Sequence, residues 1–145
     1  MLPRNGLIVD SGFWVALANP ADRYHARAIA ALETCEDQLF ISTWPVITEA
    51  SHLIGRWMGH AAQMQFLRNL QSGGCDLFPL EDGHWPRVLE LMQHYRDLPM
   101  DLADASLVIL AEALGHGRIL STDQRDFGAY RWKQHEPFEN LLLPY

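Results

Sequence analysis

The sequence predicts an α/β protein of three layers, in which helices flank a central, mainly parallel sheet. Short apolar runs alternate with longer segments of helical spacing, and this alternation is typical of parallel sheets. The 145 residues match the length of one ordinary domain, and 48% of them are apolar, which is enough to bury a core. We therefore expect residues 1–145 to form a single domain.

In the first half of the chain, Leu7, Ile8 and Val9 form an apolar run typical of a strand. Pro20 separates two helical patterns, Pro45 suits the first turn of another helix, and glycines at 59 and 73–74 end the helices before them. The expected elements are a strand at 7–9, helices at 12–18 and 21–36, a strand at 39–41, and helices at 45–58 and 60–71.

In the second half, Pro99 closes a loop, and Gly115 and Gly117 end a helix that is apolar on almost every side. A helix of that kind is buried in a core or an interface. The expected elements are a strand at 76–80, helices at 81–95 and 101–114, a strand at 118–121, a turn with a short helix at 123–128, and a final strand at 138–143.

The charge balance bounds the function. The chain has 11 Lys and Arg against 18 Asp and Glu, a net charge of −7. This balance argues against a protein that binds nucleic acid through a broad basic surface. The net charge does not exclude a protein that binds nucleic acid through metal ions. Cys35 and Cys75 form no CxxC pair or secreted framework, so we expect a cytoplasmic protein. No apolar run approaches the ~18 residues of a membrane span.

Acidic residues follow the predicted strands. Asp10 ends the first strand, Glu49 lies in the helix entered from the second, Asp104 lies near the start of the apolar helix, and Asp123 follows the strand at 118–121. Each acid alone is explained by a helix cap, a turn or an exposed position, and Asp101 is the natural N-cap of its helix. Because the carboxyl ends of parallel strands share one edge, the four could also converge in one crevice.

Converging carboxylates repel one another unless they are partly protonated or hold cations. Ligation by oxygen alone favours Mg²⁺ or Mn²⁺ over zinc. Such an ion lowers the pKa of a bound water and supports hydrolysis of a phosphodiester. The sequence therefore predicts metal-assisted hydrolysis at this edge of the sheet.

The ordered motifs resemble a PIN domain of the VapC toxin type. The segments that carry the likeness are Leu7-Ile8-Val9-Asp10-Ser11, Thr48-Glu49-Ala50, Leu102-Ala103-Asp104-Ala105-Ser106-Leu107 and Ile119-Leu120-Ser121-Thr122-Asp123, with Asp126-Phe127 just after. The resemblance implies a ribonuclease that depends on Mg²⁺ or Mn²⁺, with Asp10, Glu49, Asp104 and Asp123 as catalytic metal ligands. Asp101 is a second candidate beside Asp104.

The same resemblance implies that Ser11 or Thr122 supplies a hydroxyl next to the ligands. It also implies a homodimer, held inactive by a small antitoxin protein, as the toxin of a type II toxin–antitoxin pair. Arg125 and Arg118 are candidates for contacts with RNA phosphates, although a solvated face is the blander interpretation.

Rival interpretations remain at this point. The pairs Glu49/His52 and Glu81/His84 have the Glu-x-x-His spacing of di-iron helix bundles. A PIN-like module that binds RNA or a protein without cutting is the non-enzyme alternative. The tryptophans could build an aromatic contact surface, but helical spacing favours the core for most of them.

Overall fold

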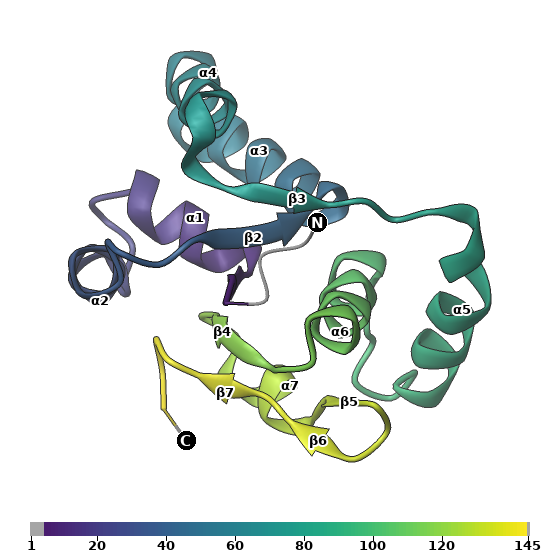
Figure 1. The fold of residues 1–145 in the computed structure, drawn as a ribbon. Coiled ribbons are helices and arrows are strands. Elements are labelled where there is room, and N and C mark those ends of the chain that lie inside the picture. The colour runs from purple at the N-terminus through teal and green to yellow at the C-terminus, as the bar shows by residue number, and fades with distance from the viewer. Residues whose placement is uncertain (1–4, 145) are drawn as a thin grey trace.

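The computed structural model describes residues 5–144, and Figure 1 shows their arrangement. The chain runs through β1 (Leu7–Val9), α1 (Ser11–Ala18), α2 (His25–Thr34), β2 (Phe40–Thr43), α3 (Trp44–Met58), α4 (His60–Asn69) and β3 (Asp76–Phe78). It continues through α5 (Trp85–His94), α6 (Leu102–Leu114), β4 (Arg118–Leu120), α7 (Gln124–Ala129), β5 (Arg131–Trp132), β6 (Glu136–Pro137) and β7 (Glu139–Asn140).

The main sheet has the order β3-β2-β1-β4-β7, and every neighbouring pair in it is parallel. This arrangement confirms the predicted α/β fold with a parallel sheet flanked by helices. The chain leaves β1 toward β2 and β3 on one side and later adds β4 and β7 on the other. Ligand sites of open α/β sheets lie at the carboxyl ends of strands where the order reverses in this way, here between β1 and β4.

Helix α6 is the most buried helix of the fold, as its apolar sequence predicts. Nine of its residues are buried, and it packs against α5, α3 and the strands β1 and β2. Gly115 ends it in the left-handed conformation, with φ of 79°, where glycine carries no steric penalty. Among residues 5–144, no helix combines the length and the apolar character needed to cross a membrane.

Several predicted element boundaries were wrong. Residues 21–24 are turns, so α2 begins only at His25, and a 3₁₀ turn at Asp82–His84 precedes α5. The final strand covers only Glu139–Asn140, because the buried side chain of Asn140 accepts hydrogen bonds from the backbone N–H groups of Leu142 and Leu143 and turns the chain. The prediction of mostly buried tryptophans was also wrong: Trp14 and Trp132 are buried, whereas Trp44, Trp57 and Trp85 are exposed.

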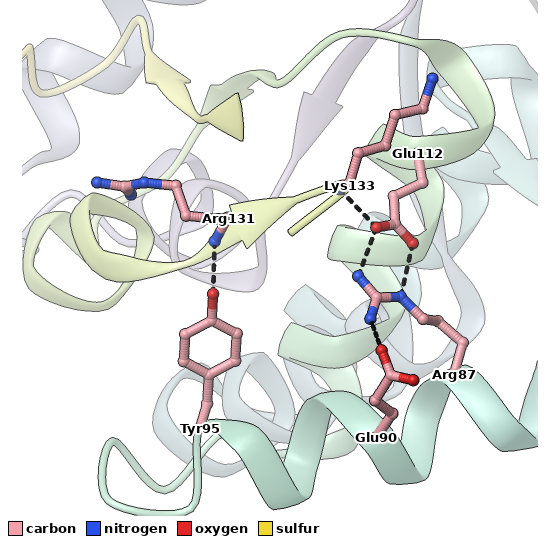
Figure 2. A network of polar contacts seen from close by, with 6 residues as sticks. All are labelled: Arg87, Glu90, Tyr95, Glu112, Arg131 and Lys133. Atoms are coloured by element: carbon pink, nitrogen blue, oxygen red, sulfur yellow. Dashed lines mark hydrogen bonds and ion pairs between the residues drawn. The ribbon is translucent and has the colours of Figure 1, made fainter. Parts of the chain in front are cut away.

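The β5–β6 hairpin, which the sequence did not predict, is tied to α5 and α6 by a polar network (Figure 2). Arg87 of α5 makes a bidentate contact with Glu112 of α6, at 2.9 and 2.6 Å, and also pairs with Glu90. The same Glu112 carboxylate accepts from the backbone N–H of Lys133, at 2.6 Å. The Glu112 carboxylate of α6 therefore holds both Arg87 of α5 and the turn of the hairpin.

Candidate functional site

Asp10 follows β1 and is buried, with 6% of its surface exposed. It caps helix α1, because its Oδ1 accepts from the backbone N–H of Ser11 at 2.7 Å. Its Oδ2 accepts from the hydroxyl of Ser121 at 2.9 Å. Burial is the main cause that raises the pKa of Asp10 to about 6, and the negative charges of Glu49 and Asp123 raise it further. Asp10 is thus a cap that also lies beside two other acids.

Glu49 lies on α3, past the first turn, where it is too far along the helix to cap it. The Ser11 hydroxyl donates to its Oε1 at 2.5 Å and lies 3.5 Å from Oδ1 of Asp10. The Ser11 hydroxyl therefore lies between the two carboxylates. Burial first, and then the charge of Asp101, raise the pKa of Glu49.

The start of α6 contributes two acids with different surroundings. Asp101 is exposed and caps the helix, since its Oδ1 accepts from the backbone N–H of Asp104 at 2.8 Å. Asp104 is half-buried, and its Oδ2 accepts from the hydroxyl of Tyr130 at 3.0 Å. Burial, then Asp101 and Asp10, raise the pKa of Asp104 to about 8. Asp101 is occupied as a cap, and Asp104 lies near enough to Asp10 for that charge to raise its pKa.

Asp123 follows β4 and caps α7, with Oδ1 accepting from the backbone N–H of Asp126 at 3.0 Å. Its own N–H donates to the hydroxyl of Ser121 at 2.9 Å, so Ser121 bridges Asp123 and Asp10. Burial raises the pKa of Asp123, and the neighbouring Asp126 raises it further. Ser121 is in turn held by Asn140, whose amide donates to the Ser121 carbonyl at 3.0 Å.

The secondary candidates Thr122, Arg118 and Arg125 have different surroundings in the structure. Thr122 packs against Gly12, where an added Cβ would lie 1.9 Å from its Oγ1, and none of the hydrogen bonds within residues 5–144 joins its hydroxyl to these acids. Arg118 lies at the amino end of β4, where its guanidinium donates to the Asn5 carbonyl at 3.4 Å, whereas Asp123 follows the carboxyl end of the same strand. Arg125 is next to the site and donates to Asp126 at 2.9 Å.

The donor set suits a hard divalent cation. The carboxylates come from four separate segments and supply only oxygen ligands. The charges of Glu49 and Asp123 raise the pKa of Asp10, and the charge of Asp10 raises the pKa of Asp104, which is the situation a bound cation relieves. Hydrogen bonds from Ser11 and Ser121 hold Asp10 in its present position. Across residues 5–144, no group of three or more His, Cys, Asp or Glu side chains already stands in metal-binding geometry. The residues fit the ion by the chemistry of their oxygen donors.

The di-iron interpretation was wrong. The chain folds around a parallel sheet rather than as a four-helix bundle. His84 is engaged in a capping box, in which its Nδ1 accepts from the backbone N–H of Glu81 at 2.9 Å. The Glu-x-x-His spacing at that point reflects helix capping.

Sequence reasoning missed three residues that contact the acids or their neighbours: Ser121, Tyr130 and Asn140. Ser121 was visible only as part of the Ser-Thr-Asp segment, in which Thr122 was chosen instead. Nothing in the local sequence of Tyr130 or Asn140 indicates a partner that lies 26 or 19 residues away.

Known proteins resemble this chain in both sequence and fold. The model of the PIN domain family matches residues 7–133. Ribonuclease VapC26 of Mycobacterium tuberculosis (strain ATCC 25618 / H37Rv) is 27% identical over 125 residues, which cover 86% of this chain and 92% of that protein. The crystal structure of Mycobacterium tuberculosis VapC20, a toxin that cleaves the sarcin-ricin loop, superposes with a TM-score of 0.74 at 19% identity, over 83% of this chain and 92% of that one.

Proposed function

Because this chain belongs to the PIN domain family, we propose that it is an endoribonuclease that uses Mg²⁺ or Mn²⁺ to hydrolyse RNA phosphodiester bonds. The observation that supports the proposal is the link of Asp10 to Glu49 through Ser11 and to Asp123 through Ser121, together with the charge of Asp10 that raises the pKa of Asp104. The 27% identity to a named ribonuclease over most of both chains supports the same activity.

In this proposal, the four carboxylates hold the metal, with Asp101 at the rim as the cap of α6. An ion held there would supply positive charge for the substrate phosphate and would lower the pKa of a bound water. Ser11 and Ser121 orient Asp10 and Glu49 through hydrogen bonds. Arg125, which lies on the surface beside Asp126, is the candidate for a contact with an RNA phosphate.

The biological setting belongs to the proposal as well. We expect a cytoplasmic toxin of a type II toxin–antitoxin pair, active as a homodimer and held inactive by a small antitoxin. The fold likeness to VapC20, which is a toxin, supports the toxin part of this setting, and a short reading frame beside this one that encodes a basic or amphipathic partner would add to it. A basic partner would also complement the net charge of −7.

Cleavage of a structured RNA tests the activity. The wild-type protein is expected to cut in Mg²⁺ or Mn²⁺ and to lose activity in EDTA, while Asp10→Asn cuts at least 100-fold more slowly, as expected when a group that stabilises the transition state is removed. Asp97→Asn is the matched control, because Asp97 is an exposed acid in the loop between α5 and α6, and this variant should cut at the wild-type rate. Equal rates for wild type and Asp10→Asn, or full activity in EDTA, would refute the proposal.

A further inference from the structure

Tyr130 brings the hydroxyl of a fully buried side chain to the acidic site. It lies just after α7, is 0% exposed, and donates to Oδ2 of Asp104 at 3.0 Å. No other hydrogen bond to the Asp104 carboxylate is present within residues 5–144, and Oδ1 accepts none there. Burial and the neighbouring Asp104 raise the pKa of Tyr130, so the hydroxyl keeps its proton and acts as a donor.

Aromatic contacts fix the ring of Tyr130. It meets Tyr95 edge-on, with ring centroids 5.0 Å apart and planes at 68°, and meets Phe127 at 5.1 Å and 84°. Tyr95 is held in turn, because its hydroxyl accepts from the backbone N–H of Arg131 at 2.9 Å (Figure 2). Edge-on packing of this kind leaves the Tyr130 ring little rotational freedom, and the hydroxyl is therefore presented at a defined point.

Asp104 needs such a fixed partner. The charges of Asp101 and Asp10 act on it, and repulsion from them would turn an unsupported carboxylate away from the other acids. A hydrogen bond to Oδ2 resists that rotation and leaves Oδ1 available. Partners of this kind orient metal-binding carboxylates, and their loss typically weakens metal affinity by about 10- to 100-fold.

We propose that Tyr130 is a positioning residue, whose hydroxyl holds Oδ2 of Asp104 so that Oδ1 can bind the divalent cation. This inference rests on the proposed function, because it assumes that Asp104 is a metal ligand. It extends that function to a residue outside the four acids, contributed by the segment that leads into the β5–β6 hairpin. Tyr130 itself touches neither metal nor RNA in this account.

The test compares Tyr130→Phe with Tyr95→Phe by titration with Mn²⁺ alone, following free Mn²⁺ by electron paramagnetic resonance. Both variants keep their ring and lose one hydroxyl, but only the Tyr130 hydroxyl contacts an acid. Tyr130→Phe is expected to raise the Mn²⁺ Kd by about 10- to 100-fold, and Tyr95→Phe to leave it within about twofold. The metal concentration for half-maximal RNA cleavage should rise in parallel, with the rate recovering at saturating metal.

A double variant separates positioning from a general effect on folding. In an Asp104→Asn background, the further change Tyr130→Phe should alter the Mn²⁺ Kd by less than about twofold, since Tyr130 acts through that carboxylate. An unchanged Mn²⁺ Kd in Tyr130→Phe, or an equal rise of the Kd in Tyr95→Phe, would overturn the inference about Tyr130. The proposed function would still stand in that case if the wild-type protein binds Mn²⁺ and cuts RNA. A wild-type protein that neither binds Mn²⁺ nor cuts RNA would overturn both.

Discussion

Replacing Asp10 by Asn should stabilise the metal-free protein at neutral pH. Burial first, and then the nearby acids, raise the pKa of Asp10 from 3.8 to about 6, so its ionised form is disfavoured in the folded state. At about 1.4 kcal/mol for each pKa unit, ionisation above pH 6 costs the fold about 3 kcal/mol. A neutral Asn removes that cost. The Asn side chain also disturbs the hydrogen bond that the Ser121 hydroxyl donates to position 10, because the Ser121 oxygen already accepts from the Asp123 N–H. This disturbance should lower the free energy of unfolding by about 1 kcal/mol.

The sign of this effect depends on pH. Because the folded pKa is raised, protonated Asp10 contributes its full stability below about pH 4, and that contribution is lost as the pH rises toward 6. Urea denaturation in EDTA, followed by tryptophan fluorescence, should show Asp10→Asn about 2 kcal/mol more stable than wild type at pH 8, from the two contributions above, with the gain absent at pH 4. A stability difference that does not depend on pH, or a variant that is less stable than wild type at pH 8, would refute the claim that burial disfavours the ionised form of Asp10.

Two further substitutions separate the support of the site from the support of the fold. Asn140→Ala removes bonds to Ser121, Leu142 and Leu143 and should cost about 1 to 3 kcal/mol in the free energy of unfolding and slow RNA cleavage, because Ser121 holds Asp10. Unaltered cleavage in that variant would show that Ser121 needs no such support. Arg87→Ala breaks the bidentate pair with Glu112 and should lower stability by about 1 to 3 kcal/mol in urea denaturation, while cleavage by the folded protein stays within twofold of wild type. A large loss of cleavage there would mean that the β5–β6 hairpin shapes the site.

The sequence was sufficient for most of the parallel sheet and its helices. Apolar runs such as Leu7–Val9 followed by capped, amphipathic segments leave few alternatives to a parallel arrangement. The β5–β6 hairpin escaped prediction because each of its strands has two residues and its turn places Lys133 and Gln134, rather than glycine, at positive φ of 48° and 71°. The end of the last strand depends on the Asn140 side chain, which no periodicity reveals.

The acidic site was predictable in part for a topological reason. Carboxyl ends of parallel strands share one edge, so Asp10 and Asp123 had to lie near each other once their strands were paired. The residues that orient the acids were not predictable, because each acts across a large separation in sequence: Ser121 is 111 residues from Asp10, and Tyr130 is 26 from Asp104. A hydroxyl acquires such a role only through the packing that brings it to a carboxylate.

The chemistry of the cleaved ends tests the central claim most directly. RNA cut by the wild-type protein in Mn²⁺ should carry 5′-phosphate and 3′-hydroxyl ends, because a metal-activated water is the nucleophile. Labelling with polynucleotide kinase, with and without prior phosphatase treatment, distinguishes these from other ends. Products with 2′,3′-cyclic phosphate and 5′-hydroxyl ends would show that the ribose hydroxyl attacks instead, and would contradict a hydrolytic role for Asp10, Glu49, Asp104 and Asp123.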